Sequence, residues 1–165
     1  MYLLEEIKRI MAEKHVEDVK IFVDMDGVIA DYRFGEGENI KSNKVGTYLN
    51  KRPINTSINN LKQISKINNI DLGIISSCLF EEQSQEKNEW LDKYVPFIIK
   101  EKRIYTIAND FESRKQLKVD KIKEYMEINK HTLVILIDDT HDILFLAKKQ
   151  LGELFVPIHV ITLID

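Results

Sequence analysis

The pattern of apolar and polar residues predicts short strands that alternate with amphipathic helices. Short apolar runs rich in β-branched residues are typical of buried strands, and apolar residues three or four positions apart are typical of helices. We expect strands at residues 20–24, 71–76, 104–107, 132–137 and 155–163. We expect helices at residues 2–14, 58–67, 81–94, 113–129 and 143–150. Ser113 followed by Gln116 predicts a capping box at the start of the fourth helix.

This alternation predicts an α/β fold. Strands separated by helices pair in parallel through right-handed crossovers, and the helices then cover both faces of the sheet. We therefore expect a three-layer α/β/α sandwich with a mostly parallel, Rossmann-like sheet. The 165 residues suit a single domain. Its expected parts are an N-terminal helix at 2–14, a core at 19–30 and 54–165, and a short cap or lid insert at 31–53.

The insert at 31–53 is polar and contains glycines, so we expect a loop or small lid, not core. Some of its side chains could stack on a base or hold a leaving group, and they could equally be surface residues. They are Tyr32, Arg33, Phe34, Tyr48, Lys51 and Arg52. The apolar face of helix 2–14 is expected to pack on its own domain, with a dimer contact, and thus a homo-oligomer, as the alternative.

Composition and charge narrow the functional classes. A net charge of -3 argues against a partner that is a nucleic-acid polymer, because such binding relies on neutralising phosphates. The single cysteine, Cys78, excludes an intramolecular disulfide, so a cytoplasmic location is expected, with Cys78 as a small buried side chain. We expect no signal peptide, since the N-terminus turns acidic early, and no membrane span, since the longest apolar runs are too short.

Polar residues follow three of the predicted strands at the point where each ends. Asp24 and Asp26 follow the first, Ser76 ends the second, and Asp138 and Asp139 follow the most apolar one. In an open parallel sheet, ligands bind beyond the carboxyl ends of the strands. We therefore expect these acids and this hydroxyl to meet at one edge of the sheet, although Ser76 alone would fit an ordinary turn residue.

Acids and a hydroxyl at one edge suit metal-assisted phosphate chemistry. Mg²⁺ takes oxygen ligands and is usually held by one or two carboxylates together with substrate phosphate. One carboxylate can attack phosphorus, and a second acid two residues along a strand would point to the same side and serve as general acid and then base. A cation should balance the charge on the transferred group, and the candidates are Lys115 and Lys118. Lys118 could instead belong to a solvated helix face.

The order of these parts resembles the haloacid dehalogenase-like hydrolase superfamily, over about residues 20–151. That family has an Asp-x-Asp motif, a Ser or Thr after the second core strand, a Lys at a helix start, and an acidic pair after a later strand. The matching residues here are Asp24-Met-Asp26-Gly-Val28, Ser76, Lys118 or Lys115, and Asp138-Asp139. The resemblance implies an Mg²⁺-dependent phosphomonoester hydrolase that forms an aspartyl-phosphate.

The resemblance also implies a role for each acid. Asp24 would be the nucleophile and a metal ligand, and Asp26 the acid/base, with its backbone carbonyl on the metal. Asp139 would be the third ligand, with Asp138 as a co-ligand or neighbour. The segment 24–31 is most similar to 5'(3')-deoxyribonucleotidases, although the insert here is shorter than their cap. That similarity implies a small phosphorylated substrate, with a nucleoside monophosphate as one candidate.

Two other functions are consistent with part of the pattern. Phospho-acceptor domains of the receiver kind also gather acids, a hydroxyl and a lysine at strand ends, but in a different order along the chain. A binding module that kept the fold and lost turnover is the second alternative. His141, beside the acidic pair, is expected to be a loop residue and not a ligand, because Mg²⁺ prefers oxygen.

Overall fold

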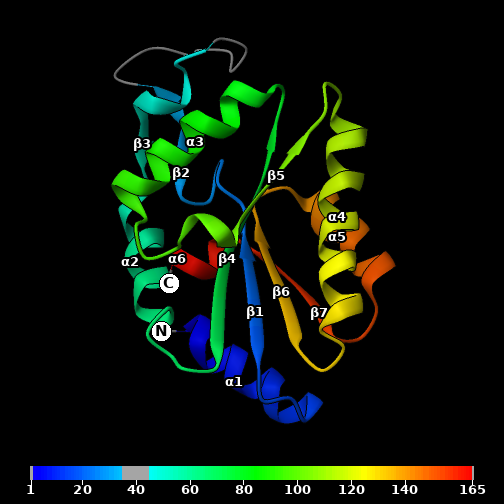
Figure 1. The fold of residues 1–165 in the computed structure, drawn as a ribbon. Coiled ribbons are helices and arrows are strands. Elements are labelled where there is room, and N and C mark those ends of the chain that lie inside the picture. The colour runs from blue at the N-terminus through cyan, green and yellow to red at the C-terminus, as the bar shows by residue number, and fades with distance from the viewer. Residues whose placement is uncertain (1, 35–44, 165) are drawn as a thin grey trace.

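A five-stranded parallel sheet forms the centre of the computed structural model, which describes residues 2–34 and 45–164 (Figure 1). Its strands are β1 (Val19–Val23), β4 (Ile70–Cys78), β5 (Arg103–Ile107), β6 (Leu133–Asp138) and β7 (Phe155–His159). They lie in the order β5-β4-β1-β6-β7, and every neighbouring pair is parallel. The predicted α/β fold with a Rossmann-like sheet is confirmed.

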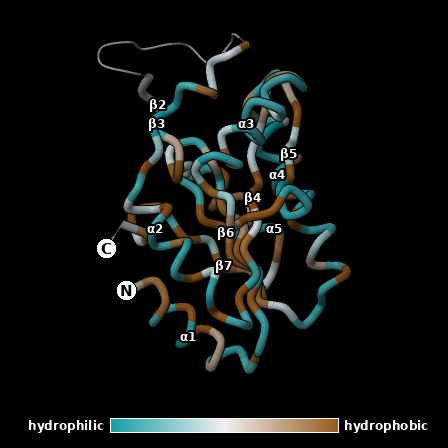
Figure 2. The backbone as a smooth tube through the Cα atoms, turned by 60° about the vertical axis from the view of Figure 1, so that its left-hand side comes forward, coloured by the Kyte–Doolittle hydropathy of each residue, from teal (hydrophilic) through white to brown (hydrophobic). Residues whose placement is uncertain are grey.

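Helices cover both faces of this sheet. They are α1 (Tyr2–Lys14), α2 (Asn55–Ile64), α3 (Glu81–Tyr94), α4 (Phe111–Ile128), α5 (His141–Leu151) and the short α6 (Ile161–Ile164). Side chains alternate across a strand, so Ile21 and Val23 of β1 pack in a core with α1, α2 and α3, whereas Phe22 packs in a second core with α4 and α5. In Figure 2 the central strands are mostly brown, the colour of hydrophobic residues.

The order in which the chain adds strands to the sheet reverses at one point, the topological switch point. From β1 the chain moves to β4 and β5 on one side, and it then crosses to β6 and β7 on the other side. In chain order the five strands therefore run 3-2-1-4-5, as in Rossmann folds, and not 2-1-3-4-5 as in flavodoxin-like signalling domains. Ligands of open α/β sheets bind beyond the carboxyl ends of the strands at such a point, which here lies between β1 and β6.

The insert is more ordered than the sequence predicted. β2 (Ala30–Phe34) pairs antiparallel with β3 (Lys51–Pro53), and a short 3-10 helix, η1 (Tyr48–Asn50), precedes β3. Tyr48 and Lys51 are buried, so the expectation of a loop outside the core was wrong for this part of the insert. The glycines at 35 and 37, and the side chains of Arg33 and Phe34, lie outside the described residues.

Several predicted boundaries need correction. The last strand stops at His159, and α6 follows, so the expected strand to residue 163 was too long. Pro157 lies within β7, where a missing N–H is tolerated because β7 is an edge strand. The start of α4 is capped by Asp110, whose side chain accepts a hydrogen bond from the Ser113 amide (2.8 Å), so the predicted capping box was wrong.

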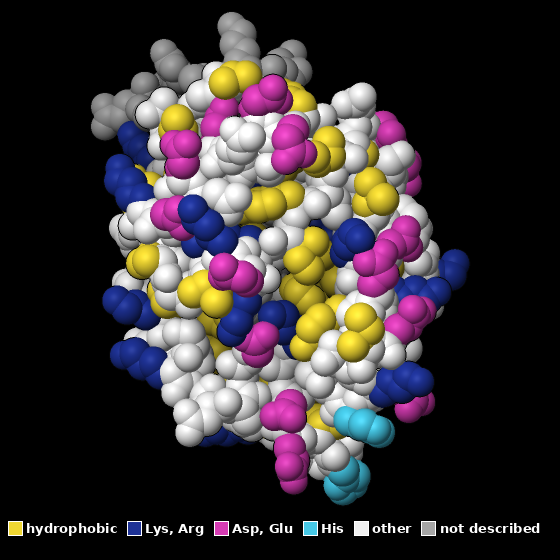
Figure 3. Space-filling view, in the orientation of Figure 1, with side chains coloured by type: hydrophobic (Ala, Val, Ile, Leu, Met, Phe, Trp, Pro, Cys, Tyr) yellow, Lys and Arg dark blue, Asp and Glu magenta, His cyan; other side chains and the backbone are white. Residues whose placement is uncertain are grey.

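The surface shown in Figure 3 carries acidic and basic side chains that are interspersed, with hydrophobic side chains between them. This face therefore has a mixed charge. Within the described ranges 2–34 and 45–164, no helix combines the length and the apolar character that a membrane crossing requires.

Candidate metal centre

Three carboxylates meet at the switch point between β1 and β6. Asp24 follows β1, Asp138 ends β6, and Asp139 comes next. The parallel register places Val23 opposite Ile137, so β1 and β6 end at the same level of the sheet. The Asp24 amide donates to the Ile137 carbonyl at 2.9 Å. One oxygen from each of the three carboxylates lies within 4.8 Å of the others. The predicted meeting of Asp24 with the acidic pair is therefore present in the fold.

Lys118 of α4 joins two of these acids. Its Nζ donates to Asp24 Oδ1 and to Asp138 Oδ2, both at 2.8 Å, and only 2% of its side chain is exposed. Burial by itself would lower the pKa of Lys118, but Asp24 and Asp138 outweigh it and raise that pKa. Lys115 instead pairs with Glu112 on the helix surface at 2.8 Å. Of the two candidate lysines, the structure places Lys118 at the acids, so it is not part of a solvated face.

The other oxygen of Asp138 and both oxygens of Asp139 accept hydrogen bonds as well. Asp138 Oδ1 accepts from the Thr140 amide at 2.9 Å, and Asp139 Oδ1 accepts from the Thr140 hydroxyl at 3.3 Å. Asp139 Oδ2 accepts from the hydroxyl of Tyr32, in β2 of the insert, at 2.7 Å. These bonds fix the orientation of the acidic pair before any ligand arrives.

The three carboxylates suit a hard divalent cation. Asp24 and Asp138 are buried, and Asp139 is half-buried. Burial raises the pKa of Asp24 to about 7; Lys118 opposes this effect, whereas Asp138 and Asp26 add to it. Oxygen-only ligand sets of this kind are what Mg²⁺ and Ca²⁺ take in proteins, and a cation would relieve the repulsion between the acids. The group could therefore hold a metal ion.

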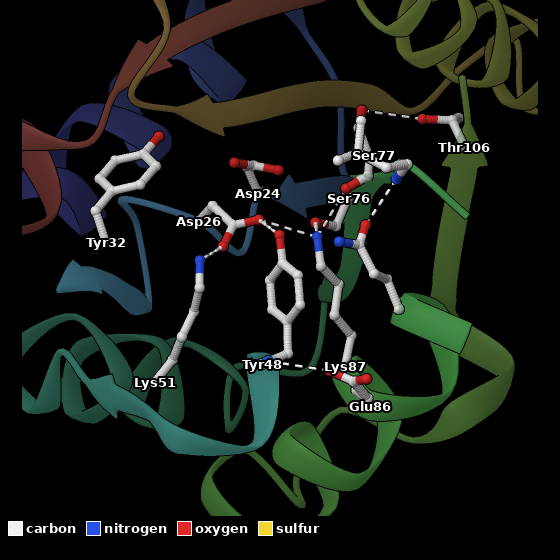
Figure 4. Close-up of polar contacts among 12 residues, drawn as sticks. Asp24, Asp26, Tyr32, Tyr48, Lys51, Ser76, Ser77, Glu86, Lys87 and Thr106 are labelled. Carbon is white, nitrogen blue, oxygen red and sulfur yellow. Dashed lines mark hydrogen bonds and ion pairs between the residues drawn. The ribbon is translucent and has the colours of Figure 1, made fainter. Parts of the chain in front are cut away.

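Asp26 belongs to a separate group of contacts. β1 ends at Val23, so the alternation of a strand does not extend to Asp26, and the predicted reason for its facing the same way as Asp24 was wrong. Its carboxylate accepts from the Lys87 ammonium (2.9 Å) and the Tyr48 hydroxyl (3.1 Å), and it is ion-paired with Lys51 (Figure 4). Contact between its backbone carbonyl and a metal stays a prediction.

The two lysines determine the charge of Asp26. Burial would raise the pKa of this carboxyl, but Lys87 and Lys51 together lower it to about 2. Lys87 remains protonated in turn: burial favours the neutral amine, yet Asp26, with smaller effects of Cys78 and Asp24, raises its pKa. Asp26 is therefore a carboxylate at neutral pH.

Ser76 lies beside this group, inside β4 and one strand away from Asp24. It is buried, and its Oγ accepts from the Lys87 ammonium at 2.8 Å. β4 continues to Cys78, so Ser76 is a strand residue and not a turn residue. In Figure 4, Ser76 and Tyr32 lie on either side of Asp24 and Asp26. The predicted hydroxyl is thus at the same edge as the acids.

Lys87 is the residue that the sequence interpretation missed. Trp90 and Leu91 are buried residues of helix α3. Lys87 comes three and four residues before these two, so it shares their buried face, and no part of its side chain is exposed. That spacing was the available signal. Tyr48 and Lys51 were among the candidate insert residues, but their position at Asp26 was not predicted.

His141 is the first residue of α5, so the expectation of a loop residue was wrong. Its ring stacks on that of His159, with 4.5 Å between the ring centroids, and His159 Nε2 lies 3.2 Å from the Asp139 carbonyl oxygen. His159 therefore contacts the backbone of the acidic pair, and His141 packs against His159.

A scan against known protein families gives no match, and a search of curated proteins finds no related sequence. Function must therefore be inferred from the fold and from the geometry of these acids and lysines.

Proposed function

We propose that this protein is an Mg²⁺-dependent phosphomonoester hydrolase of the haloacid dehalogenase-like type, with Asp24 as its nucleophile. One observation carries the proposal: Lys118 lies between Asp24 and Asp138, next to a third carboxylate, at the switch point between β1 and β6. Acids from two strands and a lysine from a helix meet there in the chain order that the superfamily uses.

The charge of the site supports an anionic substrate only when a cation is present. The site combines four carboxylates, those of Asp24, Asp26, Asp138 and Asp139, with the ammonium groups of lysines 51, 87 and 118. When all seven groups are ionised, their net charge is therefore −1. A divalent cation would make the group positive by one, which suits a phosphate dianion. Bound Mg²⁺ would neutralise charge on the phosphoryl oxygens.

The chain's own residues then divide the work. Asp24 attacks phosphorus, forming an O–P bond as the bond to the leaving oxygen breaks, and Lys118 holds Asp24 in place through its Oδ1. Ser76 supplies a hydroxyl for a phosphoryl oxygen. Asp26, which its lysines keep ionised, takes the proton from the water that hydrolyses the aspartyl-phosphate. The resemblance also implies that Asp26 protonates the leaving oxygen in the preceding step, and because its lysines keep it ionised, Asp26 must first take up a proton from solvent for that step.

We propose small phosphomonoesters as substrates, with nucleoside monophosphates as one class to test. Tyr32 supports this choice, because 57% of its surface is exposed beside the acids and its ring is available for stacking. An insert of this length is too short to seal a small substrate from water by itself, so we propose that a bulky leaving group or a neighbouring copy of the chain completes the lid.

The test is phosphate release from nucleoside monophosphates, sugar phosphates and phosphopeptides, with Mg²⁺ and with a chelator. We expect Mg²⁺-dependent release by the wild type and none by Asp24→Asn. Asp18→Asn is the matched control, because Asp18 is an exposed aspartate just before the opposite end of β1. Activity that survives Asp24→Asn would refute the nucleophile, and a protein that stays phosphorylated without release would instead favour a receiver-like phospho-acceptor.

The strand order argues against that alternative. Receiver-like domains have the flavodoxin-like order 2-1-3-4-5, whereas the order here is 3-2-1-4-5. A binding module without turnover is the third possibility, and it would show neither phosphate release nor a phosphorylated aspartate.

A further inference from the structure

Asp139 differs from the other two acids of the candidate metal centre in what holds it. Asp24 and Asp138 are both held by the ammonium of Lys118, which comes from α4 in the core. Asp139 makes no such ion pair among the described residues. Its two oxygens instead accept from hydroxyls, those of Thr140 at 3.3 Å and Tyr32 at 2.7 Å.

The bond from Tyr32 is the shorter of the two, and it comes from outside the core. Tyr32 lies in the middle of β2, so its ring reaches from the insert across the turn that follows Asp26. Gly27 makes this approach possible. A Cβ on Gly27 would lie 2.3 Å from Asp139 Oδ2 and 2.7 Å from the Tyr32 ring, and its φ of +75° also favours glycine.

We infer that Tyr32 is a positioning residue for the metal, which orients the Asp139 carboxylate and so links the insert to metal binding. The inference rests on the proposed function for the cation. Partners that donate to metal ligands fix the ligand's orientation, and their loss typically weakens metal affinity by about 10- to 100-fold. Asp139 needs such a partner more than Asp24 or Asp138, because no ammonium holds it.

The test is calorimetric titration of the full chain with Mg²⁺ and with Mn²⁺, without substrate. We expect Tyr32→Phe, which removes only the hydroxyl, to weaken the affinity for both ions by about tenfold, the lower end of that range, because Thr140 still holds one oxygen. Tyr105→Phe is the matched control: its hydroxyl donates to Asn88 at 2.9 Å, away from the acids, and its loss should leave metal affinity unchanged. Thermal unfolding verifies that both variants fold.

The outcomes separate this inference from the proposed function. If the wild type binds the ions and Tyr32→Phe binds them equally or more tightly, Tyr32 does not position Asp139, and the proposed phosphatase is unaffected. If the wild type binds neither ion, the metal-dependent function fails and the inference fails with it. A loss of affinity that appears equally in Tyr105→Phe would also overturn the inference, since the effect would not be specific to Asp139.

Discussion

Replacing Lys87 by methionine tests how the buried charges around Asp26 are held. The Lys87 side chain has no exposed surface, and its ammonium donates to Asp26 Oδ2 at 2.9 Å, to Ser76 Oγ at 2.8 Å and to the Ser77 carbonyl at 2.8 Å. Methionine has a similar length and volume, so the change removes the charge and the three hydrogen bonds while keeping most of the packing.

The magnitude follows from what Asp26 retains. Removing one partner of a buried ion pair typically costs about 3–5 kcal/mol, because the other charge stays buried. Asp26 keeps Lys51 and the Tyr48 hydroxyl, so we expect the lower end, a loss of about 3 kcal/mol in the free energy of unfolding. For a chain of this size that corresponds to a fall in Tm of about 6–12 °C.

Urea denaturation followed by tryptophan fluorescence measures this loss. The chain has one tryptophan, Trp90, which is buried on the same helix as Lys87 and reports the native state. Lys93→Met is the control, because Lys93 is exposed on that helix and its replacement should change stability by less than about 0.5 kcal/mol. A loss below about 1 kcal/mol in Lys87→Met would show that the ammonium does not stabilise Asp26 as described.

Two further predictions concern the acids themselves. Lys118→Met should lower phosphate release at least about 100-fold, because it removes the cation beside the nucleophile. The control variant Lys115→Met should stay within about twofold of the wild type. Equal losses in the two variants in a phosphate-release assay would contradict the assignment of Lys118. Burial raises the pKa of Asp24 from 3.8 to about 7, so without metal the folded protein holds a proton that the unfolded chain releases. The stability that Asp24 contributes should therefore be present at low pH and be lost as the pH rises toward about 7, and saturating Mg²⁺ should suppress this loss. Urea unfolding in EDTA from about pH 5 to 8 measures it, and a profile identical to that of Asp24→Asn would count against the raised pKa.

The hydrophobic pattern was sufficient to predict the sheet and most of its helices. β6 is fully buried and was predicted from an unbroken apolar run. α3 has the predicted bounds, with Glu81 and Glu82 in its first turn and Lys93 in its last, as the helix dipole favours. The insert was harder to predict, because its two short strands are held by pairing with each other and by contacts with residues far away in the chain. For example, Trp90 Nε1 donates to the Lys51 carbonyl at 2.9 Å, a contact between residues far apart in the chain.

Taken alone, the sequence determined the α/β fold and the three acids that meet at one edge of the sheet. Both follow from local patterns, since periodicity predicts the elements and the carboxyl ends of parallel strands lie together. Only the tertiary structure decided which polar side chains complete the site. A lysine or tyrosine looks the same in a sequence whether it is solvated or buried against an aspartate, so Tyr32, Tyr48, Lys51 and Lys87 could be assigned only from contacts that folding creates.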